Sequence, residues 1–268
     1  MSNAILSRGD FWFTLLTTGA KLRQGQCNSI KVADGEISGK PARFIAVVPD
    51  ANNKYPRASK GEVGLLEGWT LAQVVHEVIE ADKNKSDKRA IVAVIDVPSQ
   101  AYGRREEAFG IHQSLAGAAG AYAEARLAGH PVIGLIVGKA MSGAFLAHGY
   151  QANRLIAFND KGVLIHAMGK ASAARITLRS VESLEKLASS IPPMAYDIEN
   201  YSKLGLLYKL LDIANVEEPS ADEIALVKST ITEAISDALK QGVDLSNRLK
   251  AKDRHYSALV REKMRAQW

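Results

Sequence analysis

The sequence holds a single cysteine, Cys27, among its 268 residues. One thiol cannot form an intrachain disulfide, and it excludes a metal site built from several thiolates. A cytoplasmic location is therefore expected. The six histidines are scattered, with no HExxH motif and no pair four residues apart, so no protein-built metal site is expected either.

Long apolar runs are also absent. No stretch of 18 or more apolar residues occurs, so no membrane-spanning helix is expected. The beginning, MSNAILSRGD, lacks the basic and then apolar layout of a signal peptide, and its first four residues are either native or left from cloning. Neither GxGxxG after a strand nor GxxxxGK[ST] is present, which excludes the common dinucleotide and P-loop sites.

Aromatic residues make up only 6% of the chain and do not alternate with basic clusters. The net charge of +5 and the pI of about 9.2 suit acidic or phosphorylated partners. Without aromatic stacking platforms, this charge does not predict nucleic-acid binding. The apolar fraction of 47% is typical of a globular protein, and the length suffices for one large core.

Two short apolar segments, residues 90–96 and 131–137, predict buried strands that each run into a turn and a helix. Between them, residues 104–129 predict an Ala-rich helix long enough to cross back over a sheet. Strands and helices alternate along the chain. This order predicts an α/β fold with largely parallel strands.

The pattern changes after Pro219. Ser220 and Glu223 form a capping box at the start of a long helix that Gly242 ends, and residues 248–268 predict a last, basic helix. We therefore expect a main domain over residues 1–215 and a helical extension over residues 216–268. The apolar stripes of the extension indicate either contact with a partner protein or packing on the main domain.

The turn after the second strand admits two chemical interpretations. Ala140-x-Ser142-x-Ala144 is a loose match to the GxSxG nucleophile elbow, and His166 follows a later strand. With Asp197 or Asp212, these residues would make a serine hydrolase. Alternatively, Ser142 is a small residue in a tight turn and His166 a histidine at a strand end.

The second interpretation uses the backbone. The amides of Gly143 and Ala144 lie where a helix begins after a strand, and small side chains let a ligand oxygen approach. Donors placed for charge that develops in a transition state form an oxyanion hole. The structural alternative is that both residues only allow close packing of helix and strand.

Several short motifs resemble the second half of biotin-dependent carboxyltransferases. Glu67-Gly68-Trp69, which stands before a predicted helix, resembles the alpha subunit of acetyl-CoA carboxylase carboxyltransferase. Ser7-Arg8-Gly9 with Trp12-Phe13 is more similar to the gamma subunit of biotin-independent malonate decarboxylase. The resemblance covers roughly residues 5–215 and rests further on Ile95-Asp96-Val97-Pro98, Gly103, Glu106-Glu107, Gly110-Ile111, Tyr122-Ala123-Glu124-Ala125, Pro131-Val132 and Gly138-Lys139-Ala140-Met141-Ser142-Gly143-Ala144-Phe145.

This resemblance implies a crotonase-like (Clp/crotonase) spiral of strand–strand–helix turns with C-terminal helices. It implies a carboxy-lyase that works with a homologous beta subunit and converts a malonyl thioester to an acetyl thioester and CO2. The phosphopantetheine arm of an acyl carrier protein would carry the substrate. No cofactor would bind directly, because the thioester carbonyl is itself the electron sink. A further implied partner is the acyl-carrier transferase subunit.

Within that family, the amides of Gly143 and Ala144 would hold the departing carboxylate, and the beta subunit would supply the hole for the enolate. Ser142 is the third candidate catalytic residue. The chain departs from the carboxyltransferase pattern where Ser99 and Ser142 replace glycines. Two alternatives stay open: a Clp-like serine peptidase using Ser142 and His166, and a non-catalytic scaffold subunit.

Overall fold

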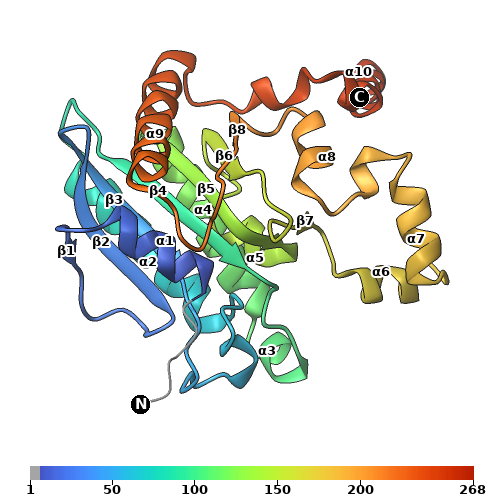
Figure 1. The fold of residues 1–268 in the computed structure, drawn as a ribbon, viewed down its shortest axis with the longest axis horizontal. Coiled ribbons are helices and arrows are strands. Elements are labelled where there is room, and N and C mark those ends of the chain that lie inside the picture. Colours follow the sequence, from blue (N-terminus) through green and yellow to red (C-terminus); the bar gives the residue numbers. More distant parts are fainter. Residues whose placement is uncertain (1–6) are drawn as a thin grey trace.

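The structure is a computed structural model that describes residues 7–268, so the first four residues, native or not, lie outside it. One twisted sheet forms its centre, with strands in the order β1-β2-β3-β4-β5-β6-β8 and β7 paired to β5 (Figure 1). The strands are β1 (Lys21–Leu22), β2 (Ile30–Ile37), β3 (Lys40–Val47), β4 (Ala90–Val97), β5 (Val132–Met141), β6 (Arg154–Phe158), β7 (Ile165–His166) and β8 (Lys209–Leu211).

Helices cover both faces of this sheet (Figure 1). The α-helices are α1 (Arg8–Leu16), α2 (Leu65–Ala81), α3 (Arg104–Ala108), α4 (Ile111–Leu127), α5 (Ser142–Ala147), α6 (Lys170–Ile176), α7 (Val181–Ala188), α8 (Ile198–Lys203), α9 (Ala221–Gln241) and α10 (His255–Gln267). Short 3-10 turns are η1 (Pro56–Ala58), η2 (Pro192–Met194), η3 (Ser246–Leu249) and η4 (Lys252–Arg254). Helices α6, α7 and α10 stand away from the sheet in Figure 1.

The expected parallel sheet is confirmed from β3 onward, where β3, β4, β5, β6 and β8 pair in parallel. The first three strands pair antiparallel instead. Ser38 (φ 49°) and Gly39 (φ 74°) join β2 to β3 as a two-residue loop. Two left-handed residues give the turn whose twist matches that of a hairpin.

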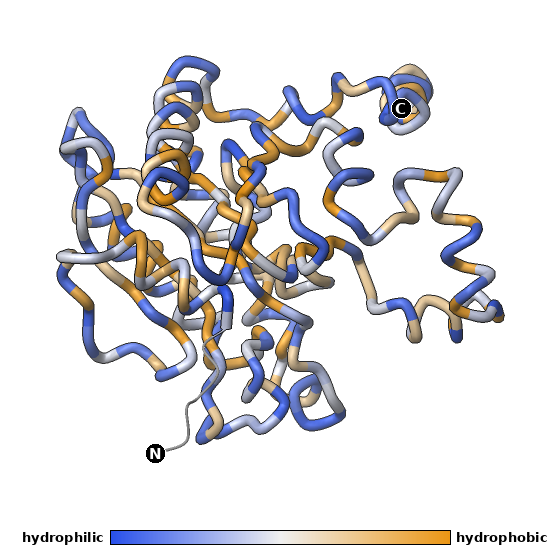
Figure 2. The backbone as a smooth tube through the Cα atoms, viewed as in Figure 1, coloured by the Kyte–Doolittle hydropathy of each residue, from blue (hydrophilic) through white to orange (hydrophobic). Residues whose placement is uncertain are grey.

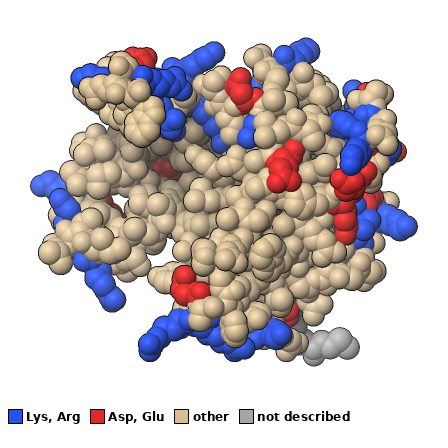
Figure 3. Space-filling model, turned by 180° about the vertical axis from the view of Figure 1, so that it is seen from behind, with Lys and Arg blue, Asp and Glu red and all other residues tan. Residues whose placement is uncertain are grey.

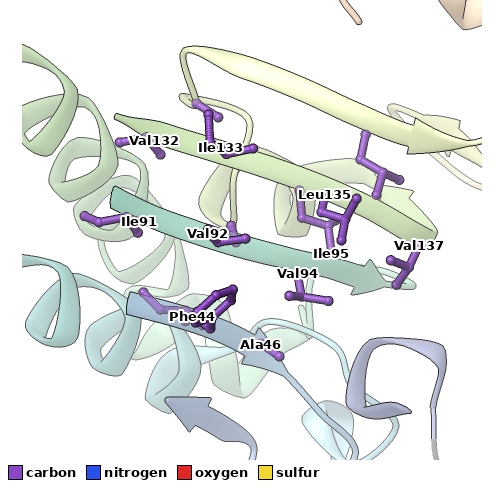
Figure 4. Packing of buried hydrophobic residues seen from close by; sticks show 14 of the residues in the cluster. Phe44, Ala46, Ile91, Val92, Val94, Ile95, Val132, Ile133, Leu135 and Val137 are labelled. Atoms are coloured by element: carbon purple, nitrogen blue, oxygen red, sulfur yellow. The ribbon is translucent and has the colours of Figure 1, made fainter. Parts of the chain in front are cut away.

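A single large hydrophobic cluster fills the space between the sheet and its helices. Figure 4 shows how side chains from β3, β4 and β5 pack against one another within this cluster. In Figure 2 the same strands carry the colour of hydrophobic residues. Phe44, Ile91, Ile95, Ile133 and Leu135 have no more than 1% of their surface exposed. Strands buried on both faces need near-continuous apolar runs, which is the pattern of residues 90–97 and 132–137.

Short pairings at or just beyond the carboxyl ends of the strands add a second strand to the spiral turns. Val63 pairs with Gln100, Val97 with Ala140, and Met141 with His166, all in parallel. Each successive turn of strand, bridge and helix therefore stacks on the one before it. This confirms the expected spiral of strand–strand–helix turns.

Two helix predictions need correction. The helix expected over residues 104–129 is broken at Gly110, whose φ of 81° is left-handed and ends α3 before α4 begins. Helix α2 begins at Leu65, so Glu67-Gly68-Trp69, expected to stand before a helix, lies inside its first turns. The Glu67 carboxylate accepts hydrogen bonds from the backbone N–H of Gly64 (3.0 Å) and the hydroxyl of Ser29 (2.5 Å), and this network fixes the earlier start.

Helices α2 and α4 touch backbone to backbone at Gly68. A Cβ atom added to Gly68 would lie 2.7 Å from the carbonyl oxygen of Ser114, and the Ser114 hydroxyl already donates to Leu65 O at 2.8 Å. We predict that Gly68→Ala lowers the free energy of unfolding by about 2–3 kcal/mol, because the helices must separate. Denaturant titration measures this.

Gly120 on the same α4 is the matched control, because a Cβ atom there would meet nothing within 4 Å. Gly120→Ala is expected to stabilise the protein by about 0.5–1 kcal/mol. Equal effects of the two substitutions would contradict the close approach of α2 and α4.

The C-terminal helices behave differently from each other. The capping box predicted at Ser220 and the end at Gly242 are both confirmed in α9. Val227, Ile231 and Ala234 of α9 belong to the main hydrophobic cluster, so this helix packs on the main domain. Helix α10 begins only at His255, after two 3-10 turns, and buries none of its residues. The domain boundary at residue 215 stays a prediction.

On the face shown in Figure 3, basic side chains lie along the edge that carries α3 and on α10, among other places. Within residues 7–268, no helix is both long and apolar enough to cross a membrane. The same residues contain no group of three or more His, Cys, Asp or Glu side chains placed to hold a metal ion.

Candidate active site

The carboxyl ends of β4 and β5 lie side by side, as neighbouring parallel strands require. Val97 pairs with Ala140 after a shift in register, and the chain after each strand turns into the same region. The Asp96 carboxylate fixes this edge, because it accepts N–H groups from Gly9 (3.1 Å) and Lys139 (3.0 Å). The motifs around Asp96 and Gly9 therefore meet at one point of the fold.

Ser142 begins α5 with a left-handed backbone, at a φ of 51°. Such a conformation costs a residue other than glycine about 1–2 kcal/mol. The hydroxyl oxygen of Ser142 accepts a hydrogen bond from the backbone N–H of Gln100 at 3.2 Å. Ser142 therefore joins the two turns, and its side chain is already engaged in holding them together.

The N–H of Gly143 donates to the side-chain oxygen Oε1 of Gln100 at 2.6 Å. An amide oxygen thus lies at the place where a substrate oxygen would accept the same hydrogen bond. The backbone on both sides of Gln100 is paired with Val63, so Gln100 can vacate this place by turning its side chain alone.

Sequence reasoning missed Gln100. A signal was present, because Gln100 follows β4 by three residues and the carboxyl ends of adjacent parallel strands share one edge of the sheet.

Ala144 is completely buried and belongs to the main hydrophobic cluster. Gly143, by contrast, is partly exposed. Of the two predicted amide donors, Gly143 is the one at the surface, and the role of Ala144 stays a prediction.

A cavity of about 300 Å³ opens beside this turn. Ser142 and Gly143 form part of its wall, and His166 lines it from β7. Its other lining residues are Phe145, Leu146, Tyr150, Ile165, Ala167, Pro192, Pro193, Ala195, Tyr201, Leu204 and Leu206. The described lining residues include no Asp, Glu, Lys or Arg, so the cavity suits an uncharged group better than an ion.

His166 shares the cavity with Ser142, but no hydrogen bond joins the two among the described residues. Its Nδ1 lies 3.0 Å from the carbonyl oxygen of Met168, and its ring stacks on Tyr196 with centroids 3.9 Å apart. Burial lowers the pKa of His166, which favours the neutral ring.

The two candidate carboxylates are engaged elsewhere. Asp197 caps α8 by accepting from the N–H of Asn200 (2.9 Å), and Asp212 accepts from the side chain of Asn159 (2.7 Å). The groups of the predicted hydrolase triad are thus not connected.

Comparisons with known proteins indicate the family of this chain. The family model for the malonate decarboxylase gamma subunit matches residues 58–268. The malonyl-S-ACP:biotin-protein carboxyltransferase MADD of Malonomonas rubra is 38% identical over 185 residues, which are 68% of this chain. This chain spans 63% of the length of that relative.

Solved structures match over nearly the whole chain. A Pseudomonas malonate decarboxylase hetero-tetramer in complex with coenzyme A contains a chain 61% identical, covering 98% of this chain and 100% of its own, with a TM-score of 0.94. A Pseudomonas MdcD-MdcE hetero-dimer matches with 59% identity, the same coverage of both chains and a TM-score of 0.90.

A more distant structure, the transcarboxylase 12S core, shares 18% identity over 87% of this chain and 42% of its own, with a TM-score of 0.63. That likeness concerns the fold alone. The motifs predicted from sequence, the spiral fold and the family match agree. This chain belongs to the family of malonate decarboxylase gamma subunits.

Proposed function

We propose that this chain acts with a homologous beta subunit to decarboxylate a malonyl thioester, giving an acetyl thioester and CO2. The observation that carries the proposal is the Gly143 N–H, held at the edge of an uncharged cavity and occupied by an amide oxygen. In the substrate complex, an oxygen of the malonyl carboxylate replaces the Gln100 oxygen on this donor.

The enolate that forms needs a second set of donors. Decarboxylation moves an electron pair into the thioester carbonyl, whose oxygen becomes negative and requires stabilisation in the transition state. We assign these donors to the beta subunit, in keeping with the MdcD-MdcE hetero-dimer of Pseudomonas. The substrate arrives on the phosphopantetheine arm of an acyl carrier protein, which an acyl-carrier transferase subunit loads, in the cytoplasm.

Release of CO2 from malonyl carrier protein tests the proposal. We expect no activity from this chain alone, none from the beta subunit alone, and rapid release from the pair. Activity of the beta subunit alone, at the rate of the pair, would make this chain a scaffold. Hydrolysis of the thioester without release of CO2 would favour the hydrolase alternative.

Substitutions of Ser142 separate the decarboxylase from the serine hydrolase. We predict that Ser142→Gly keeps kcat within about threefold of the wild type and stabilises the protein by up to about 1 kcal/mol, because glycine accepts the left-handed backbone. Ser142→Ala keeps this strain, and both variants lose the hydrogen bond from the Gln100 N–H. Activity assays and thermal unfolding measure both effects. A complete loss of activity in both variants, with fluorophosphonate labelling of the wild type, would instead identify Ser142 as a nucleophile.

A further inference from the structure

The cavity beside Ser142 and Gly143 has no charged wall among its described lining residues. Its polar groups are one serine hydroxyl, one imidazole, and the tyrosines Tyr150 and Tyr201. The hydroxyl of Tyr201 is buried without a hydrogen-bond partner in the described part of the chain. The wall therefore offers a carboxylate hydrogen-bond donors, among them the amide of Gly143, but no cationic side chain. Arg248 does not line the cavity, although its guanidinium lies 5.1 Å from the centroid of the Tyr150 ring.

Decarboxylation moves the negative charge of the carboxylate out of an uncharged cavity. The bond between the carboxylate carbon and the α-carbon breaks, and its electron pair forms the enolate on the thioester oxygen. CO2 leaves without charge, and a proton from water later replaces it on the α-carbon. A carboxylate held against uncharged walls is costly, whereas neutral CO2 is not. The uncharged walls thus destabilise the bound substrate more than the transition state. The activation barrier falls, and kcat increases.

We propose that this cavity receives the carboxylate end of the malonyl thioester, and that its lack of charge accelerates the loss of CO2. The inference rests on the proposed function and assigns the cavity its ligand, a carboxylate that becomes CO2. A strong cationic partner for the carboxylate would defeat this arrangement by stabilising the substrate.

Leu146 offers a direct test, because it lines the cavity from α5 while 51% of its surface is exposed. A long side chain at this position can reach the cavity without disturbing the core. In the complex with the beta subunit, we expect Leu146→Arg to lower KM for malonyl carrier protein roughly fivefold, the effect of a modest ion pair, and to lower kcat by at least the same factor. Leu146→Met is the uncharged reference.

A second arginine on a different element, η2, guards against a local effect of α5. Pro193 is exposed and lines the cavity from η2, so Pro193→Arg is compared with Pro193→Ala. Both arginine variants should leave inhibition by acetyl carrier protein unchanged, because that product has no carboxylate to bind. Gel filtration confirms that each variant still associates with the beta subunit.

The outcomes separate the two proposals. If both arginine variants have the KM of their references or a higher one, the carboxylate does not enter this cavity and the inference is wrong, even though the wild-type pair releases CO2. If the wild-type pair releases no CO2, the proposed function itself fails. A simultaneous fall in KM and kcat, limited to the malonyl substrate, supports the inference.

Discussion

Gly143→Val should reduce the rate of CO2 release by the subunit pair on the order of 10²–10³, equivalent to about 3–4 kcal/mol of transition-state stabilisation. A Cβ atom on Gly143 would lie 3.1 Å from the Cδ atom of Gln100 and 3.4 Å from a methyl group of Leu115, and closer still to the Gln100 amide oxygen. A branched side chain adds two methyl groups to this crowded place. It therefore blocks the approach of any oxygen to the Gly143 N–H.

The measurement is steady-state CO2 release by the variant pair, with association checked by gel filtration and folding by thermal unfolding. Gly120→Ala serves as the control glycine, because its Cβ atom would point into open space on α4. A Gly143→Val pair that associates normally and keeps near wild-type kcat would remove the backbone amide from the mechanism. Loss of association alone would assign Gly143 to the interface.

The part of the site that sequence could predict is the part set by strand order. Adjacent parallel strands put the turns after β4 and β5 at one edge of the sheet, and the small residues of the second turn point to Gly143. What occupies the Gly143 N–H depends on the side-chain rotamer of Gln100, 43 residues away in the chain. Local patterns carry no information on such a contact.

The same distinction explains part of the error at the start of α2. Glu67 accepts from the nearby Gly64 N–H, but it also binds the hydroxyl of Ser29, a contact between segments 38 residues apart. The capping box of α9, in contrast, lies within four residues, and its prediction is confirmed. The break at Gly110 is also signalled locally, because a glycine within a helical pattern can mark the end of a helix. The division between α3 and α4 was therefore predictable from the chain itself.

Acid should destabilise the protein through His148, which lies completely buried between β4 and α4. Its Nε2 donates to Val94 O at 3.0 Å, and its Nδ1 accepts from the hydroxyl of Tyr122 at 3.0 Å. Burial lowers the pKa of His148 to about 4 from its usual 6.5. The imidazole therefore stays neutral in the folded protein at a pH where the unfolded chain binds a proton.

The direction of the effect follows from proton binding. Between pH 6.5 and 4 the unfolded state holds more protons at this site, so the free energy of unfolding falls as the pH falls through this window. At 1.36 kcal/mol per unit of pKa shift, the full loss is about 3 kcal/mol at pH 4. Above pH 6.5 this contribution is complete and constant.

Denaturant titrations of the wild type and of His148→Gln across pH 4–7 isolate this contribution. Glutamine supplies an amide that can donate to Val94 O and a carbonyl that can accept from Tyr122, but it does not titrate. His130 and His166, whose pKa values burial also lowers, remain in both proteins and cancel from the comparison. As the pH falls from 7 to 4, the wild type should lose about 3 kcal/mol more free energy of unfolding than His148→Gln does. Parallel curves would mean that His148 already accepts a proton in the folded state, and the polar pair with Tyr122 would then have to rearrange within the core.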